Sequence, residues 1–253
     1  MSIIEAIILG IIQGLTEFLP VSSSGHLVLM GKIFGVEGDF VLFSVLMHVA
    51  TLLAVLIYFH KDIWLLVKKP FGKDAIKLYI ATVPTVLIVL LFKGFIENSF
   101  GGAILPFCFM FTAILLIVSQ VLSKKAGKGI TKTGAFCMGV AQGIAVLPGI
   151  SRSGATICTG LIMGYDRQES AKFSFLMSVP IILASLLYEL LGIFQGNAVQ
   201  SVGVLQLILG FIMAFIVGLL SIKLMMKIVK NMKLYWFAVY LIIISIISFV
   251  ILF

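Results

Sequence analysis

The stretch that decides the fold occurs twice, as GIIQGLTEFLPVSSSGHLVLMGKIFG at residues 10–35 and as GVAQGIAVLPGISRSGATICTGLIMG at residues 139–164. The copies align without a gap at an offset of 129 residues, about half of the 253-residue chain. Nine of the 26 aligned positions are identical, and five of those nine are glycine. The polar middle differs, because the first copy carries Glu17 and His26 and the second carries Arg152. This pattern indicates an internal repeat whose halves contribute different chemistry.

The composition is that of a membrane protein. Hydrophobic residues make up 61% of the chain, charged residues 11%, and the mean hydropathy is +1.23, whereas soluble domains average about 45–50% apolar. The apolar runs approach the roughly 20 residues that a helix needs to cross a bilayer, and they lack the alternation of outer-membrane strands. We therefore predict an all-α polytopic membrane protein. The net charge of +8 does not indicate a nucleic-acid partner, because the basic residues lie in short loops between apolar runs.

The chain reads as one membrane domain made of two repeats, residues 1–129 and 130–253. The two copies of the quoted stretch, near residues 3–34 and 133–163, are apolar at their ends and broken by Pro, Ser and Gly. They predict re-entrant helix–loop–helix elements, since non-helical backbone within a bilayer must be buried in protein or line a cavity. Six continuous apolar runs predict transmembrane helices, at residues 40–59, 78–96, 104–122, 173–191, 203–222 and 234–253.

The basic residues predict the orientation. The loops 61–77, 124–132, 167–172 and 223–233 hold 5, 4, 2 and 4 of the 18 Lys and Arg residues. By the positive-inside rule these loops are cytoplasmic and both termini face outward. Each half has three spans, an odd number, so the halves enter the membrane in opposite senses. This is an inverted-topology repeat, in which the two broken loops are expected to meet near the middle of the bilayer.

The two loops carry the candidate site residues. Serine hydroxyls and backbone N–H groups at a helix start favour an anion, and an arginine fork suits phosphate oxygens. Arg152 needs a partner, because an arginine at the bilayer centre costs at least about 2.5–3.5 kcal/mol on insertion scales. A purely structural Glu17–Arg152 pair is the alternative, although the loops hold more polar groups than such a pair requires. The candidate catalytic residues are Glu17, Ser23, His26 and Arg152, and the candidate anion-binding residues are Gln13, Ser22, Ser24, Gly25, Ser151, Ser153, Gly154 and Thr156.

Other polar and small residues are assigned structural roles. His48, near the outer end of a predicted span, is expected to be a helix-contact histidine. Glycines outside the two loops are expected to let membrane helices approach closely. The odd count of three cysteines gives neither a disulfide framework nor a metal spacing.

At QGLTEFLPVSSSGH (13–26) and LPGISRSGAT (147–156) the chain resembles the bacterial undecaprenyl-diphosphate phosphatase family, membrane enzymes associated with bacitracin resistance. The resemblance covers essentially the whole chain. It implies hydrolysis of undecaprenyl diphosphate to the monophosphate and inorganic phosphate in the bacterial cell membrane, which recycles the lipid carrier for peptidoglycan synthesis. It also implies that Glu17, Ser23, His26 and Arg152 carry activity. Gln13 stands where some members have a second glutamate, which weakens any two-carboxylate metal site.

Several alternatives stay open from the sequence. Ser23 can act as nucleophile with Glu17 or His26 taking its proton, or one of these bases can activate water while Ser23 donates a hydrogen bond. Mg²⁺ or Ca²⁺ is the expected type of ion, bridging phosphate oxygens and Glu17, and no organic cofactor is expected. The rival functions are a secondary transporter or polyprenyl-phosphate flippase that uses the same loops, and an assembly protein. Besides the lipid substrate, a second copy of the chain, as a homodimer, is left open as a partner.

Overall fold

The computed structural model describes residues 1–36, 41–123, 127–194, 202–231 and 234–253. These residues form helices, turns and one isolated bridge between Lys128 and Tyr165. The helices are α1 (Ile3–Thr16), α2 (Ser23–Ile33), α3 (Val41–Tyr58), α4 (His60–Lys68), α5 (Lys73–Leu91), α6 (Lys93–Ser99), α7 (Leu105–Leu122), α8 (Lys132–Ile144), α9 (Arg152–Ile162), α10 (Arg167–Phe194), α11 (Val204–Asn231) and α12 (Tyr235–Leu252).

Within these described ranges, five helices are long and apolar enough to cross a membrane, namely α5, α7, α10, α11 and α12. Helix α3 continues into α4 through a bend of 81°, and this pair is a sixth span if it is counted as one. Many large apolar side chains on these helices are exposed, among them Leu91, Val121 and Val250. Such a surface suits lipid rather than water. The chain is therefore an all-helical, multi-pass membrane protein, as its composition predicts.

The predicted spans fall on α3, α5, α7, α10, α11 and α12, but the helix boundaries differ from the apolar runs. The run at residues 78–96 is interrupted at Phe92, where α5 ends and the short α6 begins. Helices α10 and α11 have 28 residues each and extend beyond the runs, because hydropathy marks the lipid-facing part of a helix and not its ends. The first run was predicted from Phe40, which lies outside the described residues.

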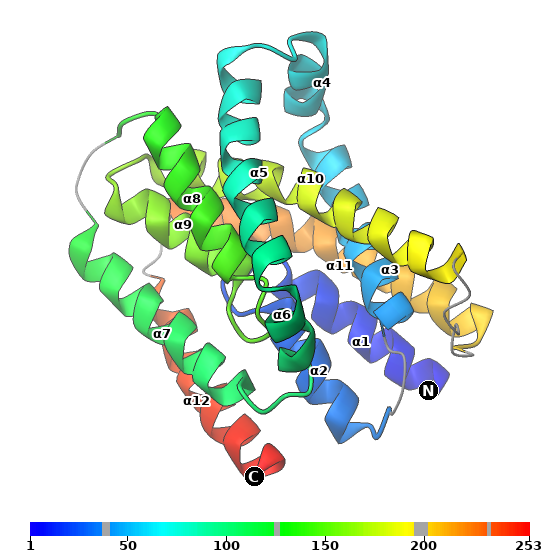
Figure 1. Ribbon diagram of the computed structural model, residues 1–253. Helices are drawn as coiled ribbons and strands as arrows, with labels where there is room; N and C mark the ends of the chain where they lie inside the picture. Colours follow the sequence, from blue (N-terminus) through cyan, green and yellow to red (C-terminus); the bar gives the residue numbers. More distant parts are fainter. Residues whose placement is uncertain (37–40, 124–126, 195–201, 232–233) are drawn as a thin grey trace.

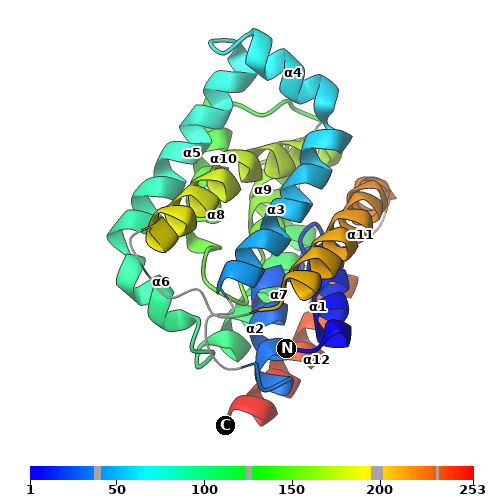
Figure 2. The same ribbon diagram turned by 90° about the vertical axis from the view of Figure 1, so that its right-hand side faces the viewer.

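The arrangement of the helices brings the two broken segments together. Helix α1 packs along α11, α8 packs along α5, and α7 packs along α12. Figure 1 and Figure 2 show both termini at one end of the molecule and α4 at the opposite end. In both views the loops that follow α1 and α8 lie inside the bundle, between these two ends.

Each broken segment restarts as a helix at a capping serine. The Ser22 hydroxyl caps α2 by accepting from the Gly25 N–H at 3.3 Å, and the Ser151 hydroxyl caps α9 by accepting from the Gly154 N–H at 3.0 Å. Serine is among the best N-cap residues because its side chain replaces the missing backbone acceptor of the first turn. The two serines are separated by the repeat offset, so both loops are built in the same way.

Close glycine contacts hold the broken helices against their partners. A Cβ added at Gly10 would overlap the Gly210 carbonyl oxygen, and one added at Gly139 would overlap the Ala81 carbonyl oxygen. Small residues permit this approach between membrane helices. The expected packing role is therefore confirmed at these two glycines. It is wrong for Gly31 and Gly35, because a Cβ added at either would meet nothing within 4 Å.

We expect Gly139→Ala to destabilise the protein by about 1–3 kcal/mol, the usual effect of overpacking. The added methyl group meets backbone atoms of Ala81, so α5 and α8 must separate to accommodate it. Gly94→Ala in α6 is the matched control, because the space around Gly94 is open. Thermal unfolding of the detergent-purified variants measures the difference. Equal midpoints for Gly139→Ala and wild type would contradict this prediction.

Candidate active site

The two loops contact each other directly. The Gly149 N–H donates to the Ser22 hydroxyl at 3.1 Å, and the Ser153 hydroxyl donates to the Leu19 carbonyl at 2.9 Å. A Cβ added at Gly25 would lie only 2.8 Å from the Cα of Gly149. Residues about 130 positions apart in the chain thus form one structural unit. The two loops meet, as the sequence predicts.

Ser22 fixes the geometry of this unit. It has a φ of 68° and is the only residue other than glycine with a positive φ in the described part of the chain. The left-handed region costs an L-residue roughly 1–2 kcal/mol. The Ser22 hydroxyl accepts from backbone N–H groups of both loops, those of Gly25 and Gly149. These bonds hold Ser22 in its strained conformation at the start of α2.

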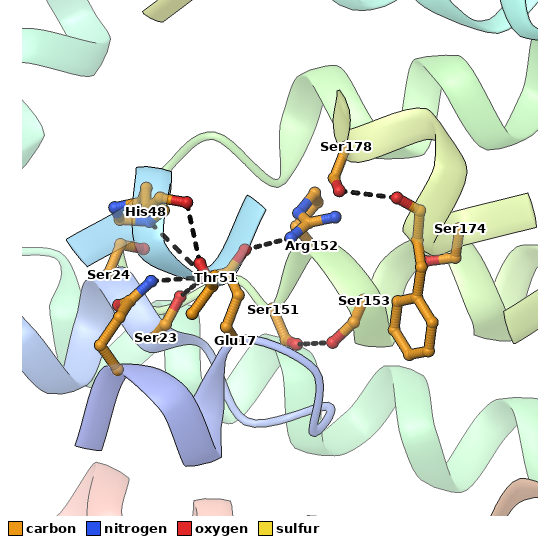
Figure 3. Close-up of polar contacts among 12 residues, drawn as sticks. Glu17, Ser23, Ser24, His48, Thr51, Ser151, Arg152, Ser153, Ser174 and Ser178 are labelled. Carbon is orange, nitrogen blue, oxygen red and sulfur yellow. Dashed lines mark hydrogen bonds and ion pairs between the residues drawn. The ribbon is translucent and has the colours of Figure 1, made fainter. Parts of the chain in front are cut away.

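Glu17 lies at the centre of the site, at the end of α1, and only 5% of its surface is exposed. Arg152 Nη2 donates to one carboxylate oxygen, Oε1. The other oxygen, Oε2, accepts from Ser23 Oγ at 2.5 Å and from Gln13 Nε2 at 2.9 Å, and His48 Nε2 lies 3.6 Å from it. Figure 3 shows Glu17 between Arg152 on one side and Ser23 and His48 on the other. A buried carboxylate is stable only with such a charge partner and hydrogen-bond donors.

Arg152 has unused hydrogen-bonding capacity. It is the first residue of α9, and its side chain is 16% exposed. Its Nη1 is buried and finds no hydrogen-bond partner among the residues that the structure describes. Buried N–H groups are almost always satisfied. An unpaired guanidinium nitrogen beside a cavity is therefore suited to receive an oxygen of an anionic ligand.

A cavity of about 710 Å³ joins these residues to the exterior. Its inner part is lined by Glu17, Ser23 and Arg152. From there it reaches Val36, after the end of α2, and Phe100, after the end of α6. These helix ends lie at the end of the molecule that carries both termini (Figure 1 and Figure 2). The site is thus deep in the bundle but open on one side.

The predicted anion-binding residues divide into two groups. Three serines line the cavity with the central residues: Ser22, Ser24 and Ser151. The others are not among the lining residues and bond within the protein. The N–H groups of Gly25 and Gly154 are occupied by the capping serines, Ser153 binds a backbone carbonyl, and the Thr156 hydroxyl is 2.6 Å from that of Ser174. Gln13 contacts Glu17. The ligand-binding roles of all eight stay predictions.

His26 is turned away from Glu17. Its Nδ1 is 2.7 Å from the Ser22 carbonyl oxygen, and its Nε2 is 2.7 Å from the Tyr240 hydroxyl. The ring stacks on Tyr240 and meets the edge of Phe109, and His26 is not among the cavity-lining residues. Because both ring nitrogens have partners, this position does not favour His26 as the proton acceptor, and its catalytic role stays a prediction.

His48 is the site residue that sequence reasoning missed. Its Nδ1 lies 2.8 Å from the Ser44 carbonyl oxygen, a helix contact as expected, but its other ring nitrogen faces Glu17 and it lines the cavity. The available signal was a lone histidine within an apolar run. Its spacing from Glu17 says nothing about contact, because the two residues lie on different helices.

The residues at the site do not fit a resident divalent cation. No group of three His, Cys, Asp or Glu side chains suited to a metal occurs within the described ranges. Glu17 is the one carboxylate lining the cavity, and both of its oxygens already have partners. Mg²⁺ and Ca²⁺ take six or more oxygen ligands, so most would have to come from water or the substrate. A cation that arrives with the substrate stays a prediction.

Comparison with known proteins points to one family. The chain matches the family described as bacitracin resistance protein BacA over residues 6–247. It is 43% identical to a protein named undecaprenyl-diphosphatase from Carboxydothermus hydrogenoformans, over 95% of this chain and 94% of the relative. A protein of the same name from Bacteroides fragilis is 41% identical, over 98% of this chain and 97% of the relative. The match therefore includes both loops of the site.

Proposed function

Since the chain belongs to the bacitracin resistance protein BacA family, we propose that it is an undecaprenyl-diphosphatase of the bacterial cell membrane. It hydrolyses undecaprenyl diphosphate to undecaprenyl phosphate and inorganic phosphate, and so recycles the lipid carrier for peptidoglycan synthesis. The observation that carries this proposal is the convergence of Ser23 and Arg152 on the buried Glu17. A serine hydroxyl, a carboxylate and a guanidinium in a membrane cavity supply what phosphoryl transfer at a lipid head group needs.

The cavity suits an anionic head on an apolar tail. Arg152 and the hydroxyls of Ser22, Ser24 and Ser151 line its inner part and supply donors for phosphate oxygens. Apolar side chains, including those of Val28, Ile181 and Ile182, line other parts of the cavity and suit the first prenyl units. Phosphoryl transfer demands chiefly positioning and stabilisation of charge. Arg152, through its unused Nη1, is the group assigned to the diphosphate.

Ser23 is the proposed nucleophile. Its hydroxyl proton already points to Glu17 Oε2 across 2.5 Å, which is the geometry of a serine activated by an adjacent base. Ser23 Oγ bonds to the terminal phosphorus, and the bond from that phosphorus to the bridging oxygen breaks. The bridging oxygen keeps the electron pair and leaves as part of undecaprenyl phosphate. Water then hydrolyses the phosphoserine and releases inorganic phosphate. The variant in which Glu17 activates water directly needs the same residues in different roles.

We also infer an inverted-topology repeat. The repeat offset relates α1 to α8 and α5 to α11. The packing of α1 against α11 therefore corresponds to the packing of α8 against α5. The offset of 129 residues converts the contact of Gly10 with Gly210 into that of Gly139 with Ala81. With both termini outward, as the positive-inside rule predicts, the cavity opens to the outer face. Substrate would enter there, and a homodimer stays a prediction.

Release of inorganic phosphate from undecaprenyl diphosphate by detergent-purified protein tests the proposed function. We expect turnover by the wild type, measured with and without EDTA to report any dependence on a divalent ion. A transporter or flippase that uses the same loops would bind the lipid in detergent and release no phosphate. That outcome would contradict the proposed enzyme activity and favour a transport function.

A further inference from the structure

The mechanism leaves one question about Glu17. If this carboxylate takes the proton of Ser23, the proton must then leave a side chain that is only 3% exposed. His48 is a titratable group beside Glu17 that also lines the cavity and is more open to it, since its Nε2 is 3.6 Å from Glu17 Oε2 and its side chain is 26% exposed. The oxygen that faces His48 is the one that accepts from Ser23.

The hydrogen bonds of His48 define its tautomer. Its Nδ1 lies 2.8 Å from the backbone carbonyl oxygen of Ser44, and a carbonyl oxygen can only accept. The Nδ1 must therefore carry a hydrogen, and in the neutral ring the lone pair is on Nε2. That lone pair faces a carboxylate oxygen at 3.6 Å, a distance at which two acceptors lie near each other without a hydrogen bond. Adding one proton between them would create a charge-assisted pair.

We infer that His48 is a proton-relay residue that acts through Glu17. The inference rests on the proposed function and assigns to this reaction a residue from α3, outside both loops. As Ser23 Oγ bonds to phosphorus, its proton passes to Glu17 Oε2 and then to His48 Nε2. The imidazolium that forms is stabilised by the restored Glu17 carboxylate. When the oxygen of water bonds to phosphorus and the bond from phosphorus to Ser23 Oγ breaks, the proton returns by the same route to Ser23 Oγ, and both protons of the water leave with the released phosphate.

Gln13 provides the contrast within the same site. Its Nε2 donates to the same Glu17 oxygen at 2.9 Å, but an amide does not titrate. Gln13 therefore orients the carboxylate, while His48 both contacts it and can bind a proton. This division explains why a single carboxylate is sufficient here, since the second proton-binding group is an imidazole.

Two variants separate proton transfer from packing. His48→Gln keeps a side-chain amide that can hold Glu17 but cannot accept a proton, and we expect its kcat to fall about 100-fold, within the range for a general base, with KM little changed. His48→Ala should show a similar loss and should regain turnover when imidazole is added, because the cavity is open. The rate restored to His48→Ala should increase with the concentration of unprotonated imidazole. Thiazole, which has nearly the same shape but is a much weaker base, should not rescue.

Wild-type protein in the same phosphate-release assay separates this inference from the proposed function. If the wild type released no phosphate, the proposed function itself would be wrong. With an active wild type, a His48→Gln variant of undiminished kcat would overturn the relay. Equal rescue of His48→Ala by imidazole and thiazole would overturn it too, since His48 would then only fill space.

Discussion

Arg152→Lys is expected to lower kcat/KM by about 10³-fold while the protein remains folded. Lysine keeps the positive charge beside Glu17 but has a single nitrogen and no planar fork, so it cannot reproduce one nitrogen on the carboxylate and a second on a phosphate oxygen. The substitution removes Nη1 of Arg152, which has no hydrogen-bond partner among the described residues and is proposed to bind the diphosphate. Arginines that stabilise phosphoryl-transfer transition states contribute about 10³–10⁵-fold. Initial rates of phosphate release at several substrate concentrations measure the effect.

The chain offers a matched control for this variant. Arg167, at the start of α10, is the only other arginine in the sequence and is not among the residues that line the cavity. Arg167→Lys should therefore retain wild-type turnover. Gel filtration and thermal unfolding show whether both variants fold. If folded Arg152→Lys turned over as fast as the wild type, Arg152 would be a structural partner of Glu17 and not a ligand of the diphosphate.

Much of the fold follows from two sequence patterns. Continuous apolar runs identify the membrane-crossing helices, because a helix in lipid must be apolar over about 20 residues. The repeated Ser-Gly loops identify the two breaks, since Ser22 and Ser151 restart the helices as N-caps. The exact helix ends are less predictable. Breaks such as that at Phe92 arise from tertiary packing that hydropathy does not report.

The site is predictable only in part, for a physical reason. A buried arginine demands a carboxylate, and Glu17 is the acidic residue of the repeated loops, so the pair can be expected from sequence. The contact of His48 with Glu17 depends on how α3 packs beside the loops, which no local pattern contains. The orientation of His26 toward Tyr240 likewise depends on α12, more than 200 residues away. The sequence predicts roles for residues within one loop, but it does not predict contacts that come from distant helices.

Ser23→Ala distinguishes the two mechanisms and should have the largest effect of all. If Ser23 is the nucleophile, the variant lacks the atom that bonds to phosphorus, and kcat should fall by about 10⁴-fold or more, as when a catalytic nucleophile is removed. If water attacks directly, the variant loses one hydrogen bond to a charged group, which is about 1.5–3 kcal/mol and hence roughly a 10–150-fold effect. The two expectations differ enough for phosphate-release rates to separate them.

A covalent intermediate gives the second, independent measurement. Acid quenching of the wild type during turnover, followed by mass spectrometry, should detect phosphate on Ser23 and on no other serine of the loops. Ser248→Ala is the control for rate, because Ser248 is also buried but donates within α12, to the Ser245 carbonyl. Ser23→Ala retaining a tenth of the wild-type rate, with no phosphoserine trapped in the wild type, would assign the attack to water. Glu17 would then be the base for water, and the short bond from Ser23 would serve to hold that carboxylate in place.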